Sequence, residues 1–367
     1  MPTFRPDITA IEPYVAGRSI EEVALEIGVD PDDIIKLASN ESPDGPFPGV
    51  IEAGIEALKE SHRYPDDAVR SLTAGVSDYV DVPPDHLWFG NGSVALLGSI
   101  ALTAGGPGTS AVYGWPSFVM YRIISRWSMA EPIEVPLDGT FTFDLDAIRV
   151  DMRDDTTLVY LCNPNNPTGT VVAGDAIEAF VESVPESVIV VIDEAYCEFV
   201  ADRTYRTGIP LALARPNVVV LRTFSKVFGL AAHRLGYAIA RPETLTELRK
   251  AQAPFSVATV SQAVGVASLS QPEELDRRVR ANASGRSYLL SVVAERGITH
   301  SHSEANFVFM KLGDDSASVA RLFEKKGVII RPMTGGWQRV SVGTEAENQR
   351  FVAVLDELEP GARSASG

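Results

Sequence analysis

The sequence contains few cysteines and no long hydrophobic run. Cys162 and Cys197 are its two cysteines. Both lie in or directly after apolar stretches, so we expect buried free thiols rather than a disulfide framework. That usage suits a reducing compartment. No run reaches the ~18 apolar residues of a membrane-spanning helix, and residues 1–19 contain no apolar stretch of signal-peptide length. We therefore expect a cytoplasmic protein with no membrane partner.

Basic charge is also scarce. The chain has 32 lysines and arginines against 49 acidic residues, a net charge of −17. An acidic chain repels phosphate backbones, so no nucleic-acid partner is expected. Hydrophobic residues make up 45% of the 367 residues, which is enough for a large core, and this length favours two lobes over one. His300 and His302 stand close together, but no carboxylate or thiol cluster completes a metal site, so no metal is expected.

The middle of the chain alternates short apolar segments with helical patterns. The segments are β-branched and apolar on successive residues, which is typical of strands buried on both faces of a largely parallel sheet. They are residues 110–113, 157–162, 188–193, 217–222 and 236–240. Residues 175–184 read as a helix, with Asp175 and Glu178 at capping-box spacing. This rhythm predicts an α/β doubly wound core.

From about residue 256 the pattern changes to a smaller α+β lobe. A long helical region, 258–296, precedes three expected strands at 306–312, 327–332 and 337–343, and Thr344 and Glu347 would cap a last helix. Four parts are expected along the chain. They are an N-terminal arm with part of the small domain, including one helix near 19–27 (1–40), a large domain (41–255), a C-terminal small domain (256–358) and a disordered tail (359–367).

Reactive side chains follow three consecutive predicted strands. "NPNNPTG" (163–169), "DEAY" (193–196) and "RTFSK" (222–226) come next after them, and ligands of such sheets bind at the carboxyl ends of the strands. Each has an ordinary explanation by itself. Asn166 could form a turn, Asp193 could cap a helix and Lys226 could be a solvated charge. Their combination predicts a site.

These side chains fit the aldehyde, the pyridine nitrogen and the phosphate of pyridoxal 5′-phosphate (PLP). A lysine amine such as that of Lys226 forms a Schiff base with an aldehyde, and an acid such as Asp193 keeps a pyridine nitrogen protonated. The phosphate could be clamped by the two hydroxyls and the guanidinium of Thr223, Ser225 and Arg234. The glycine-rich turn "FGNGSVALLGSI" (89–100) enters an apolar helix and would add backbone N–H groups for the same phosphate.

Eight motifs in order then resemble a known family. They are "SNESPDGP" (39–46), "RYPD" (63–66), "GNGS" (90–93), "CNPNNPTG" (162–169), "DEAYCEF" (193–199), "RTFSKVFGLAAHRLGY" (222–237), "ANFVF" (305–309) and "RVSVGTEAEN" (339–348). The chain resembles fold-type I PLP-dependent aminotransferases, specifically the histidinol-phosphate aminotransferase family. The resemblance implies a large domain, with a mostly parallel seven-stranded sheet between helices, and a smaller α+β domain.

The resemblance also implies a role for each matching position. Lys226, Asp193 and Tyr196 would be catalytic. Lys226 would bind PLP covalently, Asp193 would pair with the pyridine nitrogen, and Tyr196 and Asn166 would bond the phenolic oxygen of the ring. Phe118 would stack on the ring. The phosphate would be held by Gly92, Ser93, Thr223, Ser225 and Arg234.

Further positions concern the substrate and a second subunit. Tyr64 would reach the phosphate site of a neighbouring subunit, so the resemblance implies a homodimer with shared active sites. Arg339 would bind the substrate carboxylate, and Arg331 would contact a second anionic group of the substrate. Tyr14 and Asn40 would line the entrance.

Several departures favour the aromatic amino acid aminotransferase branch of the family. Val94-Ala95 replaces the usual acidic pair, Phe118 replaces a tyrosine, and "GWPSF" and "KLASNE" look like that branch. We therefore expect amino-group exchange between an aromatic amino acid (phenylalanine or tyrosine type) and 2-oxoglutarate, with ping-pong kinetics. Histidinol phosphate stays open as the amino donor, because Tyr14, Tyr64, Arg331 and Arg339 would also fit a phosphorylated imidazole.

Two other functions use the same cofactor. A PLP-dependent lyase or decarboxylase would release ammonia or CO₂ in place of glutamate. A PLP-binding transcription regulator would need a basic DNA-binding domain, whereas about 40 residues precede "SNESPDGP" and the chain is acidic.

Overall fold

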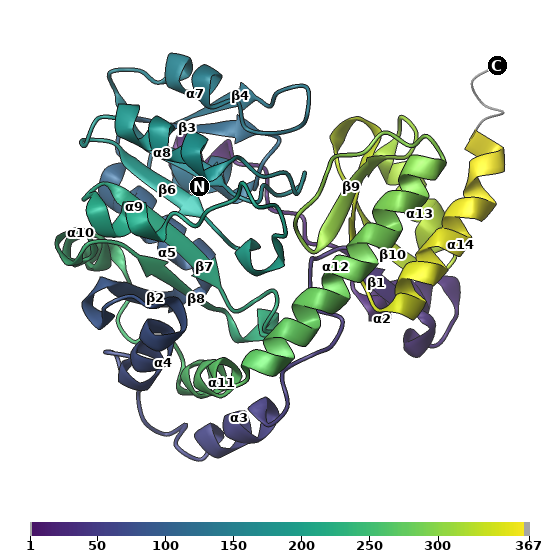
Figure 1. The fold of residues 1–367 in the computed structure, drawn as a ribbon, viewed down its shortest axis with the longest axis horizontal. Coiled ribbons are helices and arrows are strands. Elements are labelled where there is room, and N and C mark those ends of the chain that lie inside the picture. Colours follow the sequence, from purple (N-terminus) through teal and green to yellow (C-terminus); the bar gives the residue numbers. More distant parts are fainter. Residues whose placement is uncertain (1, 363–367) are drawn as a thin grey trace.

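The computed structural model describes residues 2–362 and contains two sheets, each with its own helices (Figure 1). The large sheet has seven strands in the order β2-β8-β7-β6-β5-β3-β4. Strand β8 runs antiparallel to β2 and β7, and the other neighbours pair in parallel. The bounds are β2 (Leu87–Asn91), β3 (Ser110–Trp115), β4 (Glu131–Pro136), β5 (Thr156–Cys162), β6 (Ile189–Asp193), β7 (Val218–Thr223) and β8 (Leu235–Ile239). The predicted mostly parallel seven-stranded sheet is confirmed.

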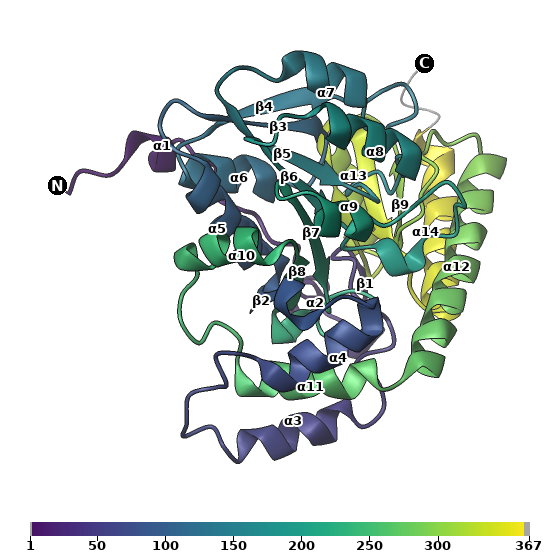
Figure 2. The same cartoon turned by 60° about the vertical axis from the view of Figure 1, so that its left-hand side comes forward.

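Helices cover both faces of this sheet (Figure 2). One face carries α5 (Gly92–Ala104), α6 (Met120–Trp127) and α10 (Pro242–Leu248), and the other carries α7 (Leu145–Asp151), α8 (Gly174–Ser183) and α9 (Ile209–Ala214). Strands covered on both sides need apolar residues at successive positions, and β5, β6 and β7 are buried almost throughout.

The ends of β5, β6 and β7 lie side by side. Cys162 of β5 is opposite Asp193 of β6, and Asp193 is opposite Leu221 of β7. The segments that follow these strands therefore emerge at one edge of the sheet, as expected for parallel strands.

The small domain packs helices on a four-stranded sheet with the order β1-β10-β11-β9. Its strands are β1 (Ile35–Leu37), β9 (Phe307–Lys311), β10 (Val328–Pro332) and β11 (Trp337–Ser341). The N-terminal part of the chain contributes α2 (Ile20–Ile27), which matches the helix expected near 19–27, whereas α1 (Pro6–Thr9) packs on α6 of the large domain. The C-terminal part adds α13 (Ser316–Glu324) and α14 (Glu345–Ala362).

The two predicted helix caps have different outcomes. At α14 the capping box is confirmed, because the Thr344 amide donates to Glu347 Oε2 at 2.7 Å and the Glu347 amide donates to Thr344 Oγ1 at 3.2 Å. At α8 the prediction is wrong. That helix begins after Ala173, which offers no side-chain cap, and Asp175 pairs with Arg206 instead.

The expected domain boundary at residue 256 is too early. Helix α11 (Thr259–Leu269) packs on α3 (Val50–Leu58) and α4 (Arg70–Val80) of the large domain. The long helix α12 (Pro272–Glu295) then serves both domains, with Leu275 and Val279 on the large core and Leu289 and Val293 in the small one. The change of domain therefore falls inside α12. The sequence missed this because helical periodicity does not say which core a helix faces.

The expected disordered tail, 359–367, is also partly wrong. Helix α14 continues to Ala362, so the first residues of that segment are helical. Residues 363–367 lie outside the described residues. Between residues 2 and 362, no helix is both long and apolar enough to cross a membrane.

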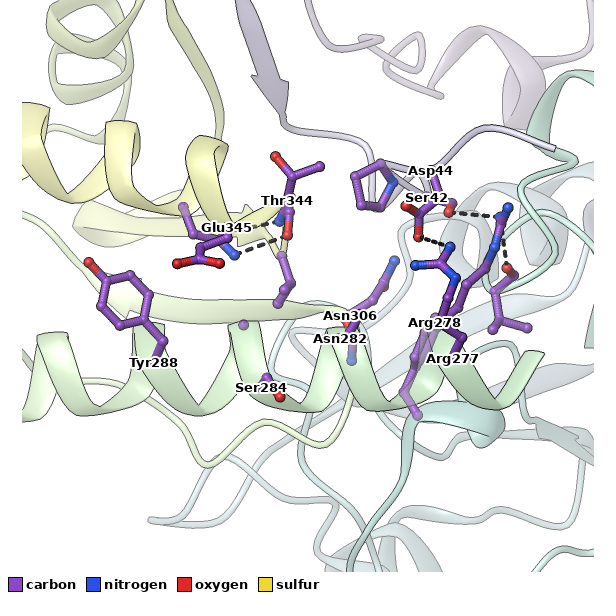
Figure 3. Close-up of a pocket in the computed structure, with 18 of the residues that line it drawn as sticks. Ser42, Asp44, Arg277, Arg278, Asn282, Ser284, Tyr288, Asn306, Thr344 and Glu345 are labelled. Carbon is purple, nitrogen blue, oxygen red and sulfur yellow. Dashed lines mark hydrogen bonds and ion pairs between the residues drawn. The ribbon is translucent and has the colours of Figure 1, made fainter. Parts of the chain in front are cut away.

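A crevice of about 520 Å³ lies along α12, where loop 42–44 and the turn before α14 approach it (Figure 3). Its two arginines are well supplied with partners. Arg278 pairs with Glu274 at 2.8 Å, donates to the Gly45 carbonyl at 2.6 Å and lies over the Phe47 ring at 4.3 Å. Arg277 pairs with Glu274 and also with Asp44. The crevice is thus held by a clamp between α12 and residues 44–47.

Candidate active site

A cavity of about 490 Å³ lies at the carboxyl ends of β5, β6 and β7, and the small domain closes one side of it. It brings together the predicted site residues except Gly92 and Tyr64. The predicted residues that line it are Tyr14, Asn40, Ser93, Phe118, Asn166, Asp193, Tyr196, Thr223, Ser225, Lys226, Arg234, Arg331 and Arg339.

Asp193 is the last residue of β6 and is 2% exposed. Its Oδ2 accepts a hydrogen bond from the Tyr121 hydroxyl at 3.0 Å, and its Oδ1 accepts one from the Ala195 amide at 3.2 Å. Burial raises the pKa of Asp193 to about 6, while these hydrogen bonds act in the opposite direction. The carboxyl group is therefore mostly ionised at neutral pH, and it can hold a protonated nitrogen.

Lys226 follows β7 in a loop whose other large side chains are anchored. Phe224, Val227 and Phe228 are at most 1% exposed, which leaves the lysine half-buried, with its Nζ 5.5 Å from the centre of the Tyr196 ring. Burial, followed by the charge of Arg339, lowers the pKa of Lys226 to about 8. A substantial share of the amine is then neutral near physiological pH, as a nucleophile or a base requires.

Polar side chains connect the two domains across the cavity. The Asn40 amide donates to the Tyr196 hydroxyl at 3.1 Å, and Arg339 Nη1 donates to Asn166 Oδ1 at 2.6 Å. Burial raises the pKa of the Tyr196 phenol, so it stays protonated and can donate a hydrogen bond. The small domain therefore contacts the residues predicted to hold the cofactor ring.

A cradle suited to a phosphate lies at the start of α5. Gly92 has φ +76°, and a Cβ atom there would lie 2.6 Å from Arg234 Nη2. At Gly236 a Cβ would lie 2.5 Å from the Ser93 amide nitrogen. Glycine is therefore favoured at both positions. The positive φ of Gly92 is one that other residues rarely adopt, and a Cβ at Gly236 would collide with the backbone at the start of α5. Thr223 Oγ1 donates to Ser225 Oγ at 2.9 Å at the same edge, so the residues present fit the phosphate of PLP.

Three arginines of the cavity have no carboxylate among their hydrogen-bond partners within the described chain. Arg234 Nη1 donates to the Ala231 carbonyl at 3.0 Å, and Arg331 Nη2 donates to the Val15 carbonyl at 2.8 Å. Arg339 bonds Asn166 and the Ala38 carbonyl, and its buried Nε has no partner among residues 2–362. Unneutralised guanidinium groups facing a cavity are suited to anionic ligands.

A wider vestibule of about 1000 Å³ adjoins the cavity and shares Tyr14, Phe118 and Arg331 with it. Its walls come from the N-terminal arm (10–15), from the start of α6 and from residues 314–317 and 331–335. Trp115 and Ile123 add apolar surface there. Substrate side chains of different sizes therefore have room beyond the charged part of the cavity.

Tyr64 is a predicted site residue that does not line this cavity. It is 82% exposed and stacks on Phe255, with ring centres 4.7 Å apart. The prediction gives it to the site of a neighbouring subunit, and that role stays a prediction.

Other lining residues were not predicted as site residues from the sequence. They include Ser39, Glu41, Met120 and Cys162. Ser39, Glu41 and Cys162 lie inside quoted motifs. Tyr121, which bonds Asp193, carried no signal beyond its place three residues after Phe118.

The fold and this cavity define a class of protein. A family model described as aminotransferase class I and II matches residues 32–355, and the chain belongs to that family, whose members depend on PLP. The protein is therefore a transaminase, and the predicted fold type is confirmed.

Individual relatives in this family carry two different activities in their names. An aromatic amino acid aminotransferase of Thermobifida fusca is 41% identical, with 96% of each chain covered. A histidinol-phosphate aminotransferase of Cupriavidus pinatubonensis is 40% identical, again with 96% of each chain covered. The solved histidinol-phosphate aminotransferase of Sinorhizobium meliloti, in complex with PLP, is 28% identical and superposes with a TM-score of 0.88 over 100% of this chain and 99% of that one. The resemblance to the histidinol-phosphate aminotransferase family, including its aromatic branch, is confirmed.

Proposed function

We propose that this transaminase binds PLP in the described cavity and exchanges an amino group between an aromatic amino acid and 2-oxoglutarate. The observation that carries the proposal is the composition of this one cavity. It combines a lysine of lowered pKa, Lys226, with a buried carboxylate, Asp193, and with arginines that lack acidic partners.

The residues present would hold PLP from every side. Lys226 would hold it covalently, Asp193 would bond the pyridine nitrogen, and Tyr196 and Asn166 would bond the phenolic oxygen. Phe118 would cover a face of the ring. The phosphate would be held by Gly92, Ser93, Thr223, Ser225 and Arg234. When bound, PLP supplies an electron sink that stabilises negative charge at the α-carbon of the substrate.

Lys226 then acts on protons. Its neutral Nζ removes the proton from the α-carbon of the donor, and as an ammonium group it can return a proton. Asp193 remains ionised and keeps its nitrogen partner protonated, which makes carbanion character at the α-carbon less costly. The same groups serve the second half-reaction, in which 2-oxoglutarate becomes glutamate, so ping-pong kinetics are expected.

The arginines would orient both substrates. Arg339 reaches the Asn166 side chain at the floor of the cavity, and there it would bind the α-carboxylate that the donor and 2-oxoglutarate share. Arg331 lies nearer the arm and would bind the second carboxylate of 2-oxoglutarate. Asn40 and Tyr14 would line the entrance.

The apolar part of the lining supports an aromatic donor. Val94 occupies the cavity wall near the phosphate cradle, together with Met120 and Phe118. Burying an aromatic ring against such groups is favourable. Histidinol phosphate is the second candidate, because Arg331 has no carboxylate partner and could take a phosphate, and because a relative with that activity in its name is 40% identical.

A half-reaction titration tests the proposal. The PLP-loaded protein is mixed with phenylalanine, tyrosine or histidinol phosphate, and the absorbance of the bound cofactor is followed. Conversion by phenylalanine or tyrosine at far lower concentration than by histidinol phosphate supports the proposal, whereas the reverse order makes histidinol phosphate the donor. In a second assay that also contains 2-oxoglutarate, formation of ammonia or CO₂ in place of glutamate would identify a lyase. Failure of the protein to bind PLP would refute the proposed cofactor.

We further propose a homodimer in the cytoplasm. Ile51, Ile55 and Leu58 form an exposed apolar stripe on α3, each at least 56% exposed. Tyr64, on the connection after α3, stacks on Phe255, and both rings are exposed. A second copy would cover these groups. Mixing Tyr64→Ala with Lys226→Ala chains tests shared sites, since one intact site would form in the mixed dimer and restore part of the activity.

The proposed location in the cytoplasm has separate support. The two free cysteines are in keeping with a reducing cytoplasm.

A further inference from the structure

Tyr121 is a fully buried residue of α6 that faces Asp193. Its hydroxyl donates to Asp193 Oδ2 at 3.0 Å, and the Ala195 amide donates to Oδ1 at 3.2 Å. Within residues 2–362, each oxygen of the carboxylate thus has one hydrogen-bond donor, and the Tyr121 hydroxyl is the donor that comes from a side chain.

The ring of Tyr121 is held in place by other aromatic rings. It stacks on Tyr160 with a centroid distance of 4.8 Å and an interplanar angle of 4°. It meets Tyr113 and Phe118 edge-on, each at 5.7 Å. A ring packed on three sides has little freedom to rotate. The hydroxyl is therefore fixed in position, and it fixes the carboxylate.

We propose that Tyr121 is a positioning residue that orients the Asp193 carboxylate and keeps it ionised, so that it can hold the protonated pyridine nitrogen of PLP. The inference rests on the proposed cofactor. It extends the site beyond the cavity lining to a residue that touches neither substrate nor cofactor in its proposed role.

The electrostatic reason follows from the groups around Asp193. Burial favours the protonated carboxyl group, and a hydrogen bond donated to the carboxylate favours the ionised form. Glu194 also raises the pKa of Asp193, and Lys226 lowers it. The titratable and charged groups facing Asp193 are Tyr121 from α6, Cys162 from β5, Glu194 and Tyr196 from the segment around its own strand end, and Lys226 from the loop after β7.

Removal of the Tyr121 hydroxyl should shift the pKa of Asp193 in one direction. Without this donor the pKa of Asp193 rises further above its ordinary value, so a larger share of the carboxyl group is protonated near pH 7. A protonated carboxyl group cannot form the ion pair with the pyridinium nitrogen. The defect should therefore be largest at low pH and should shrink as pH rises and Asp193 ionises again.

The stack offers a matched control. Tyr160 is as buried as Tyr121 and parallel to it, yet its hydroxyl has no hydrogen-bond partner among residues 2–362. Both Tyr121→Phe and Tyr160→Phe keep the stacked ring and remove one hydroxyl. They differ in that one of these hydroxyls reaches Asp193.

The experiment measures the PLP dissociation constant of the apoproteins between pH 6 and 9. Tyr121→Phe should weaken PLP binding roughly 10-fold at pH 7, the least expected for a hydrogen bond to a charged group, with a smaller loss at pH 9. Tyr160→Phe should stay within about twofold of the unmodified protein. The midpoint of thermal unfolding of each apoprotein checks that the variants are folded.

A double-mutant cycle separates positioning from packing. In an Asp193→Asn background there is no carboxylate to ionise, so adding Tyr121→Phe should cost little further affinity. An equal loss in both backgrounds would overturn the inference, as would Tyr121→Phe behaving like Tyr160→Phe at every pH. These failures differ from failure of the proposed function, in which the unmodified protein itself would not bind PLP.

Discussion

The cavity at the strand ends and the crevice along α12 both contain arginines, but the two sets are bonded differently. In the crevice, Arg278 is bonded to a carboxylate and to backbone carbonyls. In the cavity, Arg339 has no carboxylate partner among the described residues, and its Nε makes no hydrogen bond there. An arginine whose charge is already neutralised stabilises the fold, whereas one whose charge is not can bind an anion. The presence of arginines alone would therefore not show which of the two, the cavity or the crevice, binds an anionic ligand.

The largest expected effect concerns the chemistry of the cavity. Lys226→Ala should reduce transamination by at least ~10⁴-fold, because no other lysine among the described residues lines the cavity to serve as nucleophile and base. Steady-state rates with an aromatic amino acid and 2-oxoglutarate measure this. Lys250→Ala is the matched control, since Lys250 is exposed and pairs with Glu247, and it should leave the rate unchanged. Normal turnover by Lys226→Ala would invalidate the assignment of the site.

The next effect tests the unneutralised arginine. Arg339→Ala should lower kcat/KM by roughly 10²- to 10³-fold for both substrates, since each would lose a charge-assisted contact to its α-carboxylate. Arg339→Lys should recover only part of that loss, because an ammonium group cannot form the two parallel bonds of a guanidinium. Unchanged KM values for donor and 2-oxoglutarate in Arg339→Ala would mean that this arginine is structural, like those of the crevice.

The third effect tests the clamp. Arg278→Ala should lower stability by about 3 kcal/mol, because Glu274 and the carbonyl of Gly45 would lose a largely buried partner. Thermal unfolding measures the change. Arg277→Ala is the control, since Arg277 is about half exposed and its surface pairs with Asp44 and Glu274 should contribute at most ~1 kcal/mol. If Arg278→Ala raised KM for 2-oxoglutarate without loss of stability, the crevice would be a ligand site and the comparison would fail.

The site was easier to predict from the sequence than some of the elements around it. Lys226, Asp193 and Asn166 follow long runs of buried β-branched residues, and parallel strands bring their ends together whatever the loops do. Strand β4, "EPIEVP", was missed because it lies at the edge of the sheet and carries prolines and glutamates, which are unusual in central strands. Strand β1 was missed because three residues show no periodicity.

Contacts between distant segments were beyond the reach of sequence patterns. Tyr121 bonds Asp193 across 72 positions of sequence, and this contact exists because α6, which packs on β3 and β4, brings the Tyr121 side chain to the end of β6. Arg278 stands in the charged run "DRRVR" (276–280), a pattern typical of a solvated helix face, and its burial depends on residues 45–47 passing over α12. Both residues are polar, and only tertiary packing decides that they are buried.

The last prediction concerns how the rate of PLP capture by Lys226 depends on pH. Burial and the neighbouring Arg339 lower the pKa of Lys226 from 10.5 to about 8. Below that value the amine is mostly protonated, so the rate at which apoprotein captures PLP should rise about tenfold per pH unit up to pH 8 and level off above it. The rate of reaction of PLP with Nα-acetyl-lysine, whose ε-amine has an ordinary pKa, is measured in parallel to correct for titration of PLP itself. That rate should keep rising past pH 8.

The same measurement shows whether an arginine of the cavity tunes the lysine. Arg339→Ala removes a positive charge that disfavours the ammonium form, so the pKa of Lys226 should rise and the plateau in the capture rate should move to higher pH. Arg277→Ala removes a positive charge from the crevice, where Asp44 and Glu274 already balance it, and the profile should not move. A shift of equal size in both variants would mean that net charge, rather than the unneutralised arginine beside Lys226, sets the reactivity of the amine.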